Sequence, residues 1–332
     1  MDNTLKFSIV VCCYNGEATI ERCLNSLWNL SYDKSQYEIV LINDGAIDKT
    51  GEIIERILSE KSELLPLATH YVSENRGLSA ARNRGIKKSR GEIILFIDED
   101  AAASENWLIE CENSFQEINE PGIVYGPVNP FEDSNKFEKY IKDVHYTHFN
   151  NMGDQTHIMI GTNMAFHRSI FENNFQFDES FTYRGDETAL LLLLGNKYKI
   201  RYNQKMPVRH KYPQTIGIWL NERYHNGLIS RQLLKLRKTH KLKTSSSGNK
   251  KLVYIFLLLV ALVYFDTWFV LLTLIFGIGF TLALKRLVLK SKYTLLKNHY
   301  GILALVLFPF SYLLKTIGFV YHYKGLLATY QK

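Results

Sequence analysis

Short apolar runs alternate with helical segments over the first hundred residues, and this alternation constrains the fold more than any other feature of the sequence. The expected elements are strands at Phe7–Cys13, 37–42, 70–72 and 92–97, and helices at 17–30, about 48–59 with Asp48 as N-cap, and 78–89. Strand–helix–strand repetition favours an α/β fold, with a parallel sheet and helices on both of its faces.

Each of the four expected strands is followed by polar residues. Ligands of such sheets bind beyond the carboxyl ends of the strands. A single polar cluster there would be an ordinary turn or cap, but four in succession indicate a binding site. The clusters are Asn15, Asn43-Asp44, Glu74-Asn75 and Asp98-Glu99-Asp100.

The charge of the chain is divided unevenly along its length. The net charge of +7 consists of −8 over residues 1–230, with 24 basic and 32 acidic side chains, and +15 over residues 231–332, with 16 basic side chains and one acid, Asp266. A nucleic-acid-binding protein that is basic throughout would not divide in this way, so nucleic acid is not an expected partner. The four cysteines have neither disulfide-framework nor metal-site spacing, which favours a reducing compartment.

The second part of the chain has the composition of a membrane region. Residues 252–284 carry one charge in 33 positions, with eight Lys/Arg in 231–251 before them and five in 285–300 after them. This pattern predicts a transmembrane hairpin with both flanks cytoplasmic, and a third apolar segment follows at about 301–321. A buried helix hairpin of a globular domain is the alternative. Residues 216–236 predict either a basic amphipathic helix at the membrane surface or an ordinary surface helix.

Two carboxylates of the last polar cluster are candidates for a metal site. Alternate residues of an extended backbone point the same way, so Asp98 and Asp100 are expected to converge on one ligand. Hard oxygen ligands suit Mg²⁺ or Mn²⁺, and such an ion would neutralise a diphosphate. On its own, the D-x-D pattern is a weak signal and is usually just an acidic loop.

Four sequence runs occur together in an order that resembles a known family. SIVVCCYN (8–15), IVLINDGAIDKT (39–50), ENRGLSAARNRG (74–85) and GEIILFIDED (91–100) resemble the family 2 glycosyltransferases, which are inverting enzymes that use nucleotide sugars. The resemblance covers roughly residues 5–215. It implies a GT-A fold with a Rossmann-like mixed sheet, followed here by C-terminal transmembrane helices. The domains expected are therefore a catalytic domain at 1–215, an interfacial helix and linker at 216–250, and a membrane region at 251–332.

The resemblance also implies roles for residues on the donor side. Asp44 would accept hydrogen bonds from the nucleobase, typically uracil, and Asp100 would ligate the metal that bridges the phosphates. Asp98 would contact the ribose or the metal. Arg82 would support the site near the diphosphate, or else form a salt bridge that holds its helix. The donor-binding residues expected are Cys12, Tyr14, Asn15, Asp44, Asn75, Arg82, Asp98 and Glu99.

On the acceptor side, 160–171 and 177–190 match the half of the family in which a carboxylate deprotonates the acceptor. The usual order there is Glu-Asp with the second residue as base, whereas this chain has Asp186-Glu187. Register favours Glu187 and residue type favours Asp186, and the pair also fits a helix N-terminus. His210 matches an element that can reach the metal, although a lone histidine is often structural.

These features predict a membrane-anchored glycosyltransferase with a divalent metal, Mg²⁺ or Mn²⁺, as cofactor. It would move a single sugar from a UDP-sugar to a lipid-linked or membrane-proximal saccharide acceptor, in the synthesis of a cell-surface polysaccharide or glycoconjugate. The catalytic domain would lie on the cytoplasmic side of the cell membrane, where membrane lipid is a further partner. A catalytically degenerate scaffold that binds nucleotide sugar is the alternative.

Overall fold

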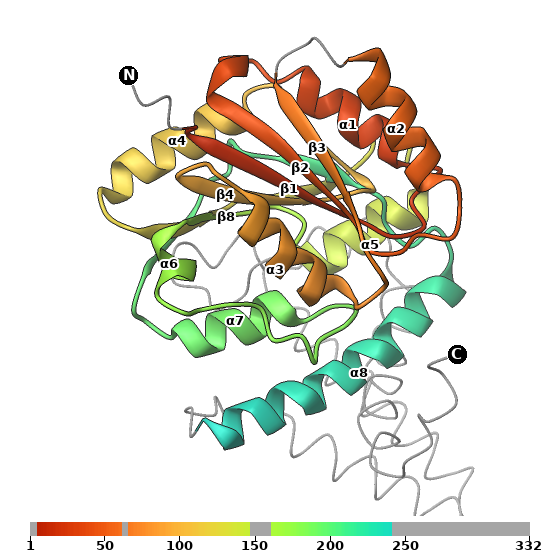
Figure 1. The fold of residues 1–332 in the computed structure, drawn as a ribbon. Coiled ribbons are helices and arrows are strands. Elements are labelled where there is room, and N and C mark those ends of the chain that lie inside the picture. The colour runs from red at the N-terminus through yellow and green to blue at the C-terminus, as the bar shows by residue number, and fades with distance from the viewer. Residues whose placement is uncertain (1–4, 62–65, 147–160, 241–332) are drawn as a thin grey trace, which may run out of the picture. The chain divides into compact units, whose positions relative to one another are not determined.

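The computed structural model describes residues 5–61, 66–146 and 161–240, with the side chains of 143–146 left out (Figure 1). The chain divides into two compact units, Met1–Gln214 and Thr215–Lys332. The segments predicted to enter the membrane, 252–284 and 301–321, lie outside the described residues. Within the described ranges, no helix combines the length and the apolar content needed to cross a bilayer.

A seven-stranded sheet in the order β3-β2-β1-β4-β8-β6-β9 is the framework of the first unit. Strands β3, β2, β1 and β4 are parallel, as predicted. Strand β8 runs antiparallel to both β4 and β6, so the whole sheet is mixed. The strands are β1 (Phe7–Cys13), β2 (Tyr37–Asn43), β3 (Leu67–Val72), β4 (Ile93–Asp98), β6 (Gly122–Tyr125), β8 (Met164–His167) and β9 (Lys199–Tyr202).

The four predicted strands all exist, and their bounds differ most where the apolar signal is weakest. Strand β1 matches its prediction because all seven of its residues are buried. Strand β3 begins three residues before the expected 70, because this edge strand is largely half-exposed and lacks a continuous apolar run.

Helices cover both faces of the sheet (Figure 1). One face carries α3 (Leu78–Lys88), α6 (Ser169–Glu172) and α7 (Asp186–Leu194), and the other carries α1 (Ile20–Trp28), α2 (Thr50–Glu60) and α4 (Trp107–Ile118). Helix α1 is shorter than the predicted 17–30. Its preceding residues form a turn in which the Thr19 amide donates to the Gly16 carbonyl. The first unit also contains α5 (Lys136–Tyr146) and the short 3₁₀ helix η1 (Lys34–Gln36), and the second contains α8 (Ile216–Thr239).

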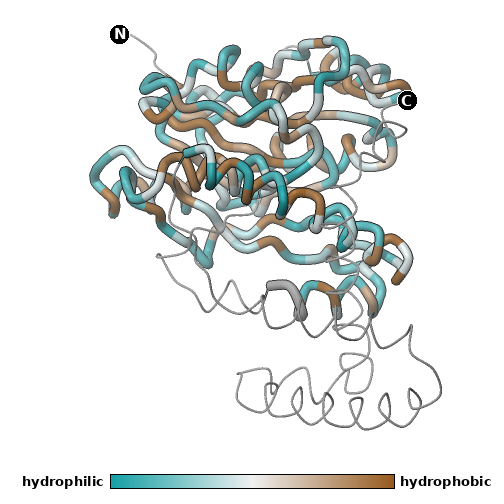
Figure 2. The backbone as a smooth tube through the Cα atoms, turned by 90° about the horizontal axis from the view of Figure 1, so that it is seen from below, coloured by the Kyte–Doolittle hydropathy of each residue, from teal (hydrophilic) through white to brown (hydrophobic). Residues whose placement is uncertain are grey.

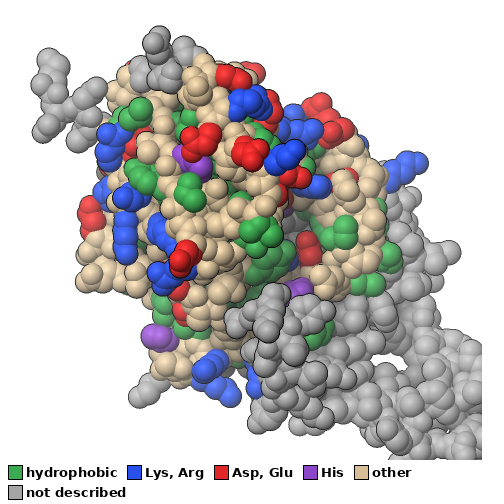
Figure 3. Space-filling model, turned by 45° about the vertical axis from the view of Figure 1, so that its right-hand side comes forward, with side chains coloured by type: hydrophobic (Ala, Val, Ile, Leu, Met, Phe, Trp, Pro, Cys, Tyr) green, Lys and Arg blue, Asp and Glu red, His purple; other side chains and the backbone are tan. Residues whose placement is uncertain are grey.

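Successive side chains of the central strands point to opposite faces of the sheet, so the apolar side chains form one buried layer on each face. Val10, Val40 and Phe96 belong to the layer beneath α3 and α7, and their sequence neighbours face the opposite layer. The hydropathy-coloured tube shows hydrophobic stretches along the central strands (Figure 2). Acidic and basic side chains lie interspersed on the outer face seen in Figure 3. The four cysteines are buried and free.

A second, three-stranded sheet positions one of the candidate residues. It consists of β5 (Ala101–Ala103), β10 (Val208–His210) and β7 (Val128–Pro130), in that order. In the antiparallel register of β10 and β5, His210 lies opposite Ala101, the residue that follows Asp100 in the sequence. Residues more than a hundred positions apart in sequence therefore meet at the carboxyl end of β4.

Candidate active site

Asp98, Asp100 and His210 form a cluster that can hold a metal ion. One ligand atom of each residue lies within 4.8 Å of the other two. The Nε2 atom of His210 is 3.0 Å from Oδ1 of Asp100 and 4.0 Å from Oδ2 of Asp98. The three side chains are 24–32% exposed, so an ion in solution can reach them. Two carboxylate oxygens and one imidazole nitrogen form a ligand set suited to Mn²⁺, and to Mg²⁺ through the oxygens.

The two aspartates converge for a different reason from the one that the sequence suggested. Strand β4 ends at Asp98, and Glu99 and Asp100 form a turn rather than a continuation of the strand. The prediction from extended backbone was therefore wrong in its geometry. Asp100 is directed by the pairing of β5 with β10 instead, and its carbonyl accepts a hydrogen bond from the amide of Lys211 at 3.3 Å.

Negative charge accumulates at this end of β4. Burial, reinforced by Asp100 and Asp98, raises the pKa of Glu99 to about 8. Burial alone would lower the pKa of His210, but Asp100 and its neighbouring acids raise it to about 9. Burial would raise the pKa of Asp100, but the neighbouring His210 holds that pKa below its usual value. Neighbouring carboxylates repel one another when all of them are ionised. A bound divalent cation would reduce this repulsion, so the cluster is suited to such an ion.

Arg82 connects this cluster to the second pair of acids. Its guanidinium donates to Asp186 at 2.7 Å, to Asp98 at 3.3 Å and to the carbonyl of Gly161 at 3.2 Å. The side chain is only 2% exposed, so it acts through its carboxylate partners rather than by touching a ligand. Burial would lower the pKa of Arg82, but Asp186 and Asp98 raise it. The salt bridge that the sequence left open as the second role of Arg82 is therefore present.

Asp186 and Glu187 differ sharply in environment although they are adjacent at the start of α7. The Asp186 side chain is fully buried against Arg82, whereas that of Glu187 is 17% exposed, with Oε2 4.0 Å from the guanidinium. Burial and the neighbouring Asp186 raise the pKa of Glu187 to about 8. A carboxylate that is partly accessible and has a pKa near neutrality has the properties of a general base.

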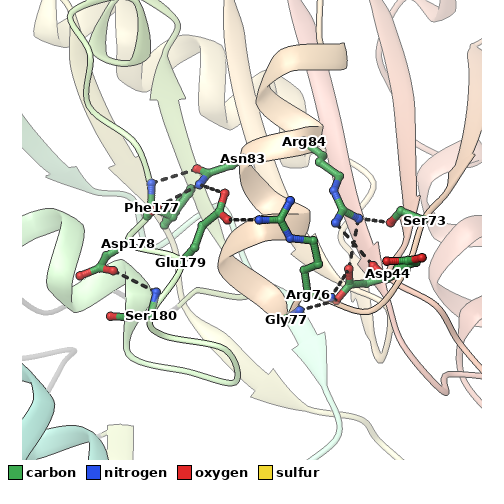
Figure 4. A network of polar contacts seen from close by, with 11 residues as sticks. Asp44, Ser73, Arg76, Gly77, Asn83, Arg84, Phe177, Asp178, Glu179 and Ser180 are labelled. Carbon is green, nitrogen blue, oxygen red and sulfur yellow. Dashed lines mark hydrogen bonds and ion pairs between the residues drawn. The ribbon is translucent and has the colours of Figure 1, made fainter.

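Asp44 lies in a separate polar network at the end of β2 (Figure 4). Its carboxylate accepts hydrogen bonds from the amides of Arg76, at 3.1 Å, and Gly77, at 2.7 Å. The guanidinium of Arg84 forms an ion pair with it at 3.2 Å. The loop before α3 and one cation on α3 thus fix the orientation of this carboxylate.

The remaining donor-side candidates occupy the neighbouring strand ends. Cys12 is buried and pairs in register with Asp98 of β4, while Tyr14 is 45% exposed. Asn15 has a left-handed φ of 54°, and its side-chain oxygen accepts a hydrogen bond from the amide of Ile47 at 2.9 Å. Asn75 is exposed in the loop before α3. The candidates therefore share one edge of the sheet, in two groups around Asp44 and Asp98.

Three contributors to the site were not identified from the sequence. Thr162 donates a hydrogen bond to Asp98, Arg84 binds Asp44, and Gly161 accepts from Arg82. The hydroxyl after a glycine in the run IGTN (160–163) is the available signal for Thr162. Nothing in the sequence distinguishes Arg84 from the other cations of α3.

Profiles of two glycosyltransferase families match the chain. The family described as Glycosyl transferase family 2 matches residues 8–175, and Glycosyl transferase family group 2 matches residues 93–284. The first match includes Asp44, Arg82 and the acids at the end of β4. The second includes Asp186, Glu187 and His210.

Two curated relatives illustrate the range of similarity. Glycosyltransferase GlyA of Streptococcus pneumoniae serotype 4 is 30% identical over 203 residues, which are 60% of this chain and 25% of that protein. Glucosyl-dolichyl phosphate glucuronosyltransferase of Haloferax volcanii is 22% identical over 223 residues, which are 62% of this chain and 69% of that protein. The chain spans 25% of GlyA, and 35% and 53% of two other curated relatives that it matches.

Two solved structures have the same fold. The mannosyltransferase PcManGT from Pyrobaculum calidifontis, in complex with GDP-Man and Mn²⁺, aligns with a TM-score of 0.62 at 16% identity, over 97% of this chain and 89% of that one. S. aureus TarS 1–349 in complex with UDP-GlcNAc aligns with a TM-score of 0.50 at 17% identity, over 71% and 73%.

Proposed function

Because the chain belongs to glycosyl transferase family 2, we propose that it transfers a single sugar from a UDP-sugar to a lipid-linked or membrane-proximal saccharide acceptor, with inversion at the anomeric carbon. The product would enter a cell-surface polysaccharide or glycoconjugate. The main observation in support is that buried Arg82 forms ion pairs both with Asp98 of the metal-ligand cluster and with Asp186, the neighbour of Glu187. One arginine thereby links a site for the leaving diphosphate to a base for the acceptor.

A divalent cation held by Asp98, Asp100 and His210 is part of this proposal. Bound Mg²⁺ or Mn²⁺ would supply the positive charge that stabilises the departing nucleoside diphosphate. The carboxylates of Asp98 and Asp100 would bind the ion, and His210 would bind it in its neutral form. Thr162 and Arg82 both hydrogen-bond to Asp98, so they hold this ligand in place.

Glu187 is the base that the geometry supports better. Its carboxylate would accept the proton of the acceptor hydroxyl, whose oxygen attacks the anomeric carbon as the bond to the β-phosphate oxygen breaks. The electron pair of that bond leaves with the nucleoside diphosphate, so an α-linked donor would give a β-linked product. Asp186 is fully buried and engaged by Arg82, so we assign it to holding Arg82 and the start of α7.

UDP is the nucleotide proposed because a neighbour of the same fold binds UDP-GlcNAc. A second neighbour binds GDP-Man, so both nucleotides belong in the test. The Asp44 carboxylate accepts hydrogen bonds from backbone amides and lies beside the guanidinium of Arg84. A hydrogen-bond acceptor and a hydrogen-bond donor are therefore adjacent here. A nucleobase edge that carries an N–H beside a carbonyl is complementary to such a pair, and both uracil and guanine have one.

Attachment to the cell membrane, with the catalytic unit in the cytoplasm, completes the proposal. Residues 252–284 and 301–321 would enter the bilayer, with the Lys/Arg-rich flanks at its cytoplasmic surface. Helix α8 ends on basic residues and exposes Ile216, Ile218 and Leu234, which suits contact with an anionic lipid surface. The relative named for a dolichyl phosphate substrate supports a lipid-linked acceptor. Carbonate extraction of cell membranes tests the attachment, and release of the full chain into the supernatant would contradict it.

The function is tested by incubating the purified full-length chain with UDP- and GDP-sugars and Mn²⁺, and measuring release of the free nucleoside diphosphate. We expect one donor to be turned over, with Glu187→Gln abolishing turnover while the nucleotide still binds. Failure of every donor to bind would contradict the proposed function. Tight binding without turnover, including after addition of lipid extracts as acceptors, would favour the degenerate scaffold instead.

A further inference from the structure

Helix α3 and the loop that leads into it contact two separate parts of the site. On one side, the loop that leads into α3 holds Asp44 through the amides of Arg76 and Gly77. On the other side, α3 contacts residues 177–185, which run directly into α7 and which we name the lead-in loop (Figure 4). The same helix therefore touches the proposed nucleobase site and the segment that carries Glu187.

Asn83 makes the most specific contact with the lead-in loop. Its side-chain amide donates to the carbonyl of Phe177 at 2.9 Å, and its side-chain oxygen accepts from the amide of Phe177 at 3.0 Å. The same NH₂ group lies 3.2 Å from Oε1 of Glu179. Asn83 is 4% exposed, so these bonds are formed away from water and losing them leaves backbone groups unsatisfied.

Further contacts continue along the loop toward α7. The amide of Leu78 donates to the carbonyl of Thr182 at 2.8 Å, and the hydroxyl of Ser79 donates to the carbonyl of Phe181. Gly77 packs so closely that an added Cβ would lie 2.7 Å from the carbonyl oxygen of Thr182. The lead-in loop is thus fixed to α3 from Phe177 to Thr182, four residues before α7 begins.

We propose that Asn83 is a positioning residue, which fixes the lead-in loop and thereby sets where the carboxylate of Glu187 stands relative to the donor. This inference rests on the proposed function. Arg76 also reaches the loop through an ion pair with Glu179 at 3.2 Å. That pair is largely exposed and contributes little. The double hydrogen bond to Phe177 is buried and directional, so Asn83 fixes the start of the lead-in loop, while Leu78 and Ser79 hold its later residues.

Asn83→Asp tests the proposal while changing only one group. The aspartate can still accept from the Phe177 amide, but it cannot donate to the Phe177 carbonyl and it sets a second carboxylate against Glu179. Because a misplacement of about 1 Å costs roughly 100-fold in rate, we expect kcat for donor turnover to fall by about 10- to 100-fold. The Kd for UDP with Mn²⁺, measured by calorimetry, stays within about twofold, since Asp44 is held by backbone amides that the change leaves in place.

Two further variants separate positioning from loss of stability. Asn203→Asp is the matched control, because Asn203 also donates to a backbone carbonyl, that of Glu110 at 2.9 Å, and lies 3.4 Å from the carboxylate of the same residue. It should lower the melting temperature as Asn83→Asp does and leave kcat unchanged. The double variant Asn83→Asp/Glu179→Gln removes the repulsion between the two carboxylates but not the loss of the donor to the Phe177 carbonyl, so it should regain stability while its kcat stays about 10- to 100-fold below that of the wild type.

An unchanged kcat in Asn83→Asp would overturn the inference, as would an equal loss in Asn203→Asp or a loss confined to nucleotide affinity. If Asn83→Asp does not fold, the double variant decides: a folded double variant with kcat reduced about 10- to 100-fold supports positioning by the hydrogen bond to Phe177, and one with wild-type kcat contradicts it. Failure of the wild type to bind UDP or GDP would refute the proposed function itself, and this result is distinct from all of the others.

Discussion

Replacing Arg82 by methionine removes a buried cation that lies between the two groups of acids. The substitution keeps an unbranched apolar stem but deletes the guanidinium, and with it the donors to Asp186 at 2.7 Å and to Asp98 at 3.3 Å. The Asp186 carboxylate is fully buried, so without Arg82 its charge has no compensation. Because Asp98 keeps the Thr162 hydroxyl and remains partly exposed, Asp186 dominates the cost.

The expected loss follows from the burial of this pair. Removing one partner of a buried ion pair costs about 3–5 kcal/mol, because the remaining charge stays desolvated. For a unit of about 200 residues, each kcal/mol lowers the melting temperature by about 2–4 °C. We therefore expect Arg82→Met to lower the melting temperature by about 6–20 °C. Arg82→Lys keeps the charge but not the two-pronged contact, so its loss should be less than half as large.

The assay is thermal unfolding of the full-length chain without added metal, followed by tryptophan fluorescence. Trp107, which is fully buried in the first unit, reports on that unit. A shift below 2 °C for Arg82→Met would refute the assignment of Arg82 as the cation that compensates Asp186. A shift as large for Arg82→Lys as for Arg82→Met would refute the account in another way, because geometry rather than charge would then dominate.

Two further predictions concern acidity and backbone conformation. Burial and Asp186 raise the pKa of Glu187 to about 8. Because the base acts only when deprotonated, kcat/KM should rise about tenfold per pH unit below pH 8 and level off above it. A kcat/KM profile that is flat from pH 6 to 9 would contradict the role of Glu187. Gly77 has φ 89° and ψ 167°, a region almost confined to glycine, and an added Cβ would contact Thr182, so Gly77→Ala should destabilise the chain by more than about 3 kcal/mol. Gly195→Ala, at φ 58° and ψ −130° with open space around the added Cβ, is the control: it has the backbone strain without the clash and should cost only about 1–3 kcal/mol in the same urea titration.

The sequence predicted the central parallel strands because these strands are buried on both faces. A strand such as β1 is an almost continuous apolar run, and it pairs with β2, the next such run along the chain, and with β4 on its other side. The antiparallel β8 could not be placed in the same way. It is four residues long and pairs with β4 across more than sixty residues of intervening chain, so no local signal specifies its direction.

At the site, sequence reasoning found the acids but not what orients them. Asp44 and Asp98 stand out because they follow apolar strands. Their partners Arg84 and Thr162 come from elements that meet them only in the folded chain. The choice between Asp186 and Glu187 as the base depended on how deeply each side chain is buried. That burial is determined by α7 and Arg82 together, and the sequence of two adjacent acids does not reveal it.

The most direct test of the account is Mn²⁺-dependent release of nucleoside diphosphate by the full-length chain and its Asp100→Asn variant, with the donor that the wild type turns over. Asp100 is the ligand closest to His210, so its loss should reduce turnover at 1 mM Mn²⁺ by at least about 100-fold. Asp33→Asn, which alters an exposed aspartate at the opposite end of β2, is the control and should retain wild-type turnover. Turnover by Asp100→Asn equal to that of the wild type would contradict the central claim that Asp98, Asp100 and His210 hold the metal on which transfer depends.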